Sequence, residues 1–110
     1  MTTRTRLLLV AAAALFGLFL IVTFADMPDG AEIFKREGCV NCHSLRGAGG
    51  SAGPELTAVT KRRTDAWIRR QLRDPKSHNP GSMMPSFAHL SRKEVSALIK
   101  YLKQDSDKAP

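Results

Sequence analysis

Aromatic side chains are scarce in this sequence. They make up 6% of the 110 residues, which excludes a large aromatic core. No segment alternates apolar and polar residues for long enough to predict a β-strand, so the expected fold class is all-α. The length allows one domain and excludes two. A helical domain this small needs an added stabilising element, such as a disulfide, a metal or a cofactor.

Charge is absent from residues 7–24, an almost wholly aliphatic run. Its eighteen residues would span about 27 Å as a helix, close to the ~30 Å hydrocarbon core of a bilayer. Arg4 and Arg6 precede the run, which predicts a cytoplasmic N-terminus and a periplasmic remainder. The alternative is a signal peptide cleaved after Thr23-Phe24-Ala25. We therefore expect residues 1–25 to be a single-pass anchor in the cytoplasmic membrane, or an uncleaved signal.

The rest of the chain divides into a linker, a domain and a tail. Asp26 to Gly30 contains proline and glycine and reads as a short linker, 26–30. Residues 31–104 form the expected domain, and residues 105–110 a polar tail. Residues 26–110 hold 15 basic and 10 acidic side chains, so this part of the chain is also basic.

Three helices are predicted in the domain. Ala31 to Glu37 reads as a short helix that Gly38 ends. Asp65 to Arg73 follows a threonine suited to cap it. The third helix follows Ser91, which starts a capping box and then an apolar pattern of helical period. The segment from Arg46 to Gly53 has four glycines and reads as a loop; it lacks the Gly-Lys-Ser/Thr of a phosphate cradle.

The segment Cys39-Val-Asn-Cys42-His43 is the strongest candidate for a functional site. Two thiols three residues apart, with a histidine beside the second, form the pattern of covalent haem attachment. The two sulfurs can bond neighbouring vinyl groups on one side of the porphyrin, and the adjacent imidazole is then placed at the iron. The segment predicts one covalently bound haem c.

Three other interpretations of the cysteines are weaker. A thioredoxin-like redox pair needs a parallel sheet, which the sequence does not predict. A zinc site needs a second pair of ligands, which His78 and His89 do not supply. A disulfide across two intervening residues would close a tiny loop and stabilise little.

The second axial ligand must come from further along the chain. The candidates are Met83, Met84, His78 and His89. We favour Met84, which precedes Pro85 in a rigid, non-helical stretch, although a methionine can also simply fill a gap in a core. A second histidine would give a lower reduction potential, whereas His/Met ligation is typical of electron-carrier cytochromes. His43 and Met84 would also leave no open position on the iron.

These motifs together resemble the monohaem class I cytochromes c of bacteria. The resemblance covers about Gly30 to Leu102. The matching residues are Gly30, Phe34, the Cys39-to-His43 motif, Gly53-Pro54-Glu55-Leu56, Trp67, Met84-Pro85-Ser86-Phe87, and Leu98 to Leu102.

The resemblance implies a fold and a set of site residues. Three to four helices would surround one covalent haem, with the first and last helices of the domain crossing. The Pro54 carbonyl would accept the Nδ1 proton of His43 and so fix the ring. Trp67 would lie by the haem or a propionate, or would only pack in the core. The implied haem-binding residues are Cys39, Cys42, His43, Pro54, Trp67 and Met84, with His43 and Met84 on the iron.

Basic residues crowd one stretch of 16 residues. They are Lys61, Arg62, Arg63, Arg69, Arg70, Arg73 and Lys76. They form either a solvated helix face or a docking surface for an acidic redox partner protein. Anionic lipid is a further candidate partner. Nucleic acid is not expected, because the compartment lacks it and no stacking aromatics are interleaved.

The favoured function is electron transfer by a tethered carrier that has no small-molecule substrate and is not an enzyme. The alternative is a fixed subunit of a larger membrane respiratory complex, such as an oxidase or reductase. A haem enzyme or gas sensor would need an open iron position, which Met84 argues against.

Overall fold

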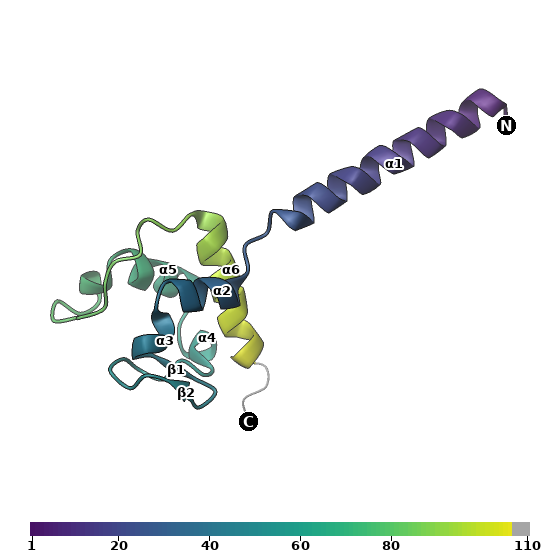
Figure 1. Ribbon diagram of the computed structural model, residues 1–110. Coiled ribbons are helices and arrows are strands. Elements are labelled where there is room, and N and C mark those ends of the chain that lie inside the picture. The colour runs from purple at the N-terminus through teal and green to yellow at the C-terminus, as the bar shows by residue number, and fades with distance from the viewer. Residues whose placement is uncertain (107–110) are drawn as a thin grey trace.

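The computed structural model describes residues 1–106, and Figure 1 shows a long N-terminal helix that projects from a helical domain. The elements are α1 (Thr3–Ala25), α2 (Gly30–Arg36), α3 (Cys39–Cys42), β1 (Ser44–Leu45), β2 (Ala48–Gly49), α4 (Val59–Arg62), α5 (Asp65–Arg73), the 3-10 helix η1 (Pro75–Ser77) and α6 (Arg92–Ser106). The fold is mainly helical, as predicted. Helix α6 takes up the first two residues of the predicted tail, and residues 107–110 lie outside the described part.

Helix α1 packs against nothing in the described part of the chain. None of its residues is buried, and its apolar side chains are exposed on every side. An 18-residue window at this end of the chain has a mean hydropathy of 2.8. By length and composition the helix can cross a membrane, although a signal sequence passes the same test.

Helices α2 and α6 cross at the centre of the domain, and the crossing depends on Gly30 (Figure 1). A Cβ on Gly30 would lie 2.2 Å from the Ala97 carbonyl oxygen and 2.7 Å from the Tyr101 Cβ. Only glycine permits such a close approach of the two helices. Next to the crossing, Ile33 and Phe34 of α2 are buried in the hydrophobic core, to which α6 also contributes.

Two helices start where their capping signals predict. Helix α5 spans the predicted residues, and the Thr64 side chain accepts a hydrogen bond from the Trp67 N–H at 3.1 Å. Ahead of α6, Ser91 Oγ accepts from the Glu94 N–H at 3.1 Å. The Glu94 carboxylate in turn accepts from the Ser91 N–H at 2.8 Å, which completes the capping box.

Several short elements and both ends of α2 differ from the prediction. The glycine-rich segment forms part of a two-stranded antiparallel hairpin, β1–β2, in which Leu45 pairs with Ala48. Strands of two residues are too short to show a period-two pattern. Helices α3 and α4 are single turns, which likewise carry no apolar periodicity. Helix α2 begins one residue before the predicted Ala31, because the Asp29 side chain caps the Ala31 N–H, and it ends at Arg36, one residue before the predicted end.

Candidate haem site

Helix α3 carries both cysteines on a single helical turn. Gly38 precedes it in the left-handed conformation, with φ of 74°, and redirects the chain after α2. Residues three apart lie on one face of a helix, so Cys39 and Cys42 present their sulfurs to the same side. Both thiols are free, Cys39 half-buried and Cys42 exposed.

The two thiols differ in their surroundings. Burial raises the pKa of the Cys39 thiol to about 11. Cys39 is therefore not itself an activated thiolate, because reactive cysteines need the opposite shift.

The His43 ring is held by the backbone of the segment that follows the hairpin. Its Nδ1 lies 2.7 Å from the Pro54 carbonyl oxygen. A carbonyl can only accept, so Nδ1 carries the proton and Nε2 keeps its lone pair. No hydrogen bond to Nε2 is found within residues 1–106, so this nitrogen can coordinate a metal.

Gly53 lies against the face of the His43 ring. A Cβ on Gly53 would be 2.6 Å from Cε1 and 2.8 Å from Nδ1 of the ring. The Gly53 N–H also donates to the Cys42 carbonyl at 2.7 Å, which fixes the glycine in place. Glycine before Pro54 thus leaves room for the imidazole.

The two adjacent methionines differ sharply in environment. Met83 is 97% exposed, which excludes it as a ligand inside the domain. Met84 is half-buried and packs against the hydrophobic core. The Met84 Sδ accepts a hydrogen bond from the Gln71 Nε2 at 3.4 Å.

Gln71 is a site residue that the sequence analysis missed. Its side-chain oxygen lies 2.9 Å from the His78 Nδ1, so Gln71 bridges His78 and Met84. The sequence offered one sign that Gln71 belongs to the site: it lies four residues after Trp67, so both residues share one face of α5.

The two other candidate histidines have partners elsewhere. The His78 ring stacks on Trp67 at a centroid distance of 4.3 Å and an interplanar angle of 1°. Nε2 of His89 lies 2.9 Å from the Glu37 carboxylate at the surface. Trp67 is half-buried, packs against the core and has the Arg63 guanidinium 4.4 Å from its ring centroid.

The donor set fits a covalent haem. It offers two free thiols on one turn, an imidazole with a free Nε2, and a half-buried thioether. Apolar side chains that pack on the core yet stay partly exposed accompany these donors, and a porphyrin would cover such a surface. They include Val40 and Leu56.

Comparison with known proteins gives the same assignment. Residues 28–106 match the family Cytochrome c. The chain is 33% identical to cytochrome c oxidase subunit 2 of Alkalihalophilus pseudofirmus over 87 residues, 68% of this chain and 24% of that protein. It is 29% identical to cytochrome c2 of Blastochloris viridis over 116 residues, 81% of this chain and 90% of that protein. A subunit of nitric oxide reductase from Stutzerimonas stutzeri is 33% identical over 86 residues, 70% of this chain and 56% of that protein.

The matched region contains the cysteine motif, the Gly53-Pro54 turn and Met84. The chain spans about a quarter of the length of the oxidase subunit and most of the length of cytochrome c2. The chain belongs to the cytochrome c family, which implies covalently attached haem c and electron transfer.

Proposed function

We propose that this chain is a membrane-tethered carrier whose haem iron is held between His43 and Met84. The observation that supports this most is the orientation of His43, whose Nδ1 bonds the Pro54 carbonyl oxygen and leaves Nε2 free. When bound, the haem supplies the chemistry, because its iron gains and loses one electron.

Each site residue has a distinct task in this proposal. Cys39 and Cys42 bond the porphyrin covalently, so the cofactor is retained when the domain opens. Pro54 fixes the tautomer and direction of the imidazole. Met84 supplies the second ligand, and Gln71 restrains its sulfur. With both His43 and Met84 on the iron, no position would remain open to a substrate.

The location in this proposal is the outer face of the cytoplasmic membrane. Helix α1 is fully exposed and apolar over residues 7–24, and two arginines precede that run. The positive-inside rule then places the N-terminus in the cytoplasm and the haem domain in the periplasm. The relatives from membrane respiratory complexes support an association with the membrane.

The partner in this proposal is a respiratory protein with an acidic docking face. Lys61 and Lys76 are exposed and lie at the two ends of the basic stretch. Complementary charge would accelerate the encounter at low ionic strength. This partner is tested by measuring the rate of electron transfer at increasing salt concentration. The rate should fall as the salt concentration rises.

A second candidate is a fixed subunit of a larger complex. The observation that favours it is the likeness to proteins named as subunits of cytochrome c oxidase and nitric oxide reductase. Gentle detergent solubilisation followed by size analysis separates the two. A single small haem particle supports the tethered carrier, whereas a stable stoichiometric assembly supports the fixed subunit.

Redox titration of the purified full-length protein tests the carrier function itself. We expect one reversible one-electron wave and no rapid binding of carbon monoxide by the reduced protein. Rapid binding would reveal an open iron position and would contradict the proposal.

A further inference from the structure

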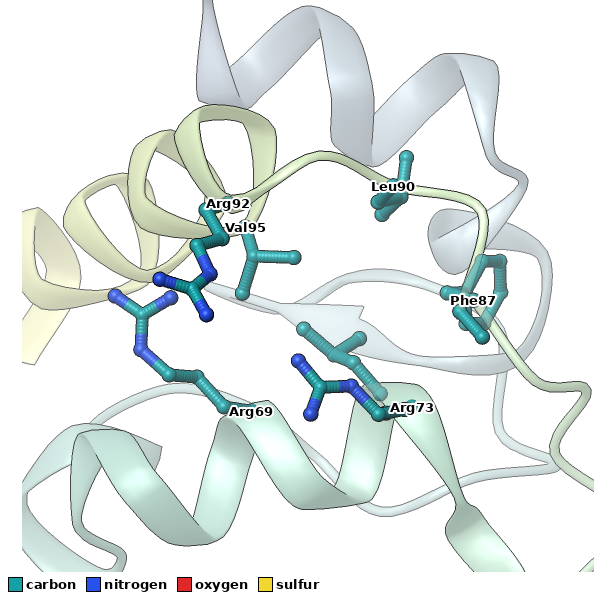
Figure 2. A pocket seen from close by; sticks show the side chains of 8 residues that line it. Arg69, Arg73, Phe87, Leu90, Arg92 and Val95 are labelled. Atoms are coloured by element: carbon teal, nitrogen blue, oxygen red, sulfur yellow. The ribbon is translucent and has the colours of Figure 1, made fainter.

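Three arginines from two helices converge on a small cavity away from the haem site. Arg69 and Arg73 come from α5, and Arg92 comes from the first turn of α6 (Figure 2). The floor between them is apolar and is formed mainly by Leu72, Phe87, Leu90 and Val95. We call Arg69, Arg73 and Arg92 the arginine cluster.

The arginine cluster has no acidic partner within residues 1–104, whose side chains the structure describes. Arg69 donates to the Ser96 hydroxyl at 2.9 Å, which leaves its charge uncompensated. No ion pair joins Arg73 or Arg92 to a described carboxylate. Elsewhere on the domain, Arg36 pairs with Glu94 at 2.9 Å and Lys103 with Asp65 at 3.0 Å.

This arrangement works against the stability of both helices. Arg69 and Arg73 are four residues apart on α5, where like charges repel. Arg92 lies at the N-terminus of α6, where the helix dipole disfavours a cation. Both helices thus carry arginines at positions that lower helix stability, and no described acidic side chain of the domain offsets this cost. Unfavourable charges gathered at one place indicate a role in binding.

The chemistry of the cluster selects a phosphate. Guanidinium groups present paired N–H donors that match phosphate oxygens, and they bind them more readily than ammonium groups do. The apolar floor beside the charges suits the carbon atoms attached to such a phosphate. The combination fits the headgroup region of an anionic phospholipid.

The chain itself keeps the cluster near a bilayer if α1 spans it. Only residues 26–29 separate the end of α1 from the start of α2, so the link reaches about 18 Å at most. The link joins the domain at Gly30, which touches Ala97 on α6. Ala97 lies five residues from Arg92 along that helix, a rise of about 7.5 Å.

We propose that the arginine cluster binds the phosphates of anionic phospholipid headgroups and so holds the haem domain in one orientation on the membrane. The proposal rests on the tether proposed above. It is separate from the haem site, because Gln71 lies between Arg69 and Arg73 in sequence and points to Met84 from another side of α5.

The test uses the full-length haem protein in nanodiscs of phosphatidylcholine, with or without phosphatidylglycerol. Once Cys39 and Cys42 are bonded to haem, Lys93→Cys provides a single free thiol beside the cluster for a spin label. With the haem reduced, the contact of the label with a water-soluble nickel relaxation reagent is measured. We expect this contact to fall when phosphatidylglycerol is present, because each arginine–headgroup contact favours the bound orientation about fivefold.

Matched variants distinguish the effect of the arginine cluster from the effect of the overall charge of the domain. The triple change Arg69→Gln, Arg73→Gln and Arg92→Gln should abolish the fall. The control triple Lys35→Gln, Lys76→Gln and Lys100→Gln removes the same charge from exposed positions and should preserve it. Equal loss in both triples would overturn the proposal in favour of a general electrostatic field.

Two further results would also overturn it. The first is no effect of phosphatidylglycerol on the label. The second is a fall caused by a polyglutamate peptide in phosphatidylcholine discs but not by the anionic lipid, which would assign the cluster to an acidic protein. If the chain does not co-purify with nanodiscs at all, the tether itself fails. An altered haem spectrum would instead identify a failure of the haem site.

Discussion

Replacing Gly53 by alanine tests how the His43 ring is held. The new methyl group would lie 2.6 Å from the ring Cε1, closer than real Cβ atoms approach other heavy atoms. Relief by backbone movement is blocked on both sides. The Gly53 N–H donates to the Cys42 carbonyl at 2.7 Å, and the next residue accepts from His43 Nδ1 at 2.7 Å.

The size of the effect follows from this overpacking. Forcing a methyl group into a packed site costs about 1–3 kcal/mol. For a domain of this size each kcal/mol lowers the Tm by about 4–8 °C, so Gly53→Ala should lower it by roughly 5–20 °C. The strain falls on the proposed iron ligand, so the haem absorbance should change before the helices melt.

The assay is thermal unfolding of the full-length haem protein in detergent, followed by haem absorbance and far-ultraviolet circular dichroism. Gly81→Ala is the matched control, because the nearest atom to its added Cβ is the Asn79 Oδ1 at an ordinary 3.5 Å. A Gly53→Ala variant with the wild-type Tm and haem absorbance would refute the packing argument.

Three further predictions concern the helix crossing, the methionine ligand and a surface carboxylate. Gly30→Ala should lower the Tm by at least as much as Gly53→Ala, because its Cβ would meet the α6 backbone at 2.2 Å; an unchanged Tm would contradict the close crossing. Gln71→Leu removes the hydrogen bond to the Met84 sulfur and should lower the reduction potential by up to about 40 mV, the equivalent of ~1 kcal/mol for one electron. Voltammetry measures this change, and a potential that rises would contradict it. The hydrogen bond from His89 is the largest cause that lowers the pKa of Glu37, so the carboxylate stabilises the fold above its ordinary pKa of 4.5 and less as the pH falls below it. The Tm difference between the wild type and Glu37→Gln should therefore be largest near neutral pH and shrink below about pH 4.5, and a difference that grows on acidification would count against it.

Signals that act within a few residues made much of the fold predictable. The Thr64 cap fixed the start of α5, and the Ser91–Glu94 box fixed the start of α6. The cysteine motif predicts the cofactor because its spacing lets both sulfurs bond one porphyrin and places the adjacent histidine at the iron. The match to the family Cytochrome c supports the same cofactor.

Contacts between distant residues were not predictable in this way. The bond from Gln71 to Met84 joins residues 13 apart and depends on how the loop after η1 folds back on α5. Two arginines of the basic stretch also have partners within the domain that the sequence did not predict. Arg62 donates to the Thr57 carbonyl at 2.8 Å, and Arg70 donates to the Ser77 hydroxyl at 2.9 Å. Only the tertiary structure brings Arg92 beside the remaining arginines of α5.

The most direct test of the central claim is the optical spectrum of the oxidised haem protein, compared between the wild type and Met84→Ala. Ligation by His43 and Met84 predicts a weak far-red band from sulfur-to-iron charge transfer in the wild type. The band should vanish in Met84→Ala and persist in Met83→Ala, whose side chain is exposed. A wild type without the band, or a band that survives in Met84→Ala, would contradict the proposed ligand and reopen the question of an accessible iron.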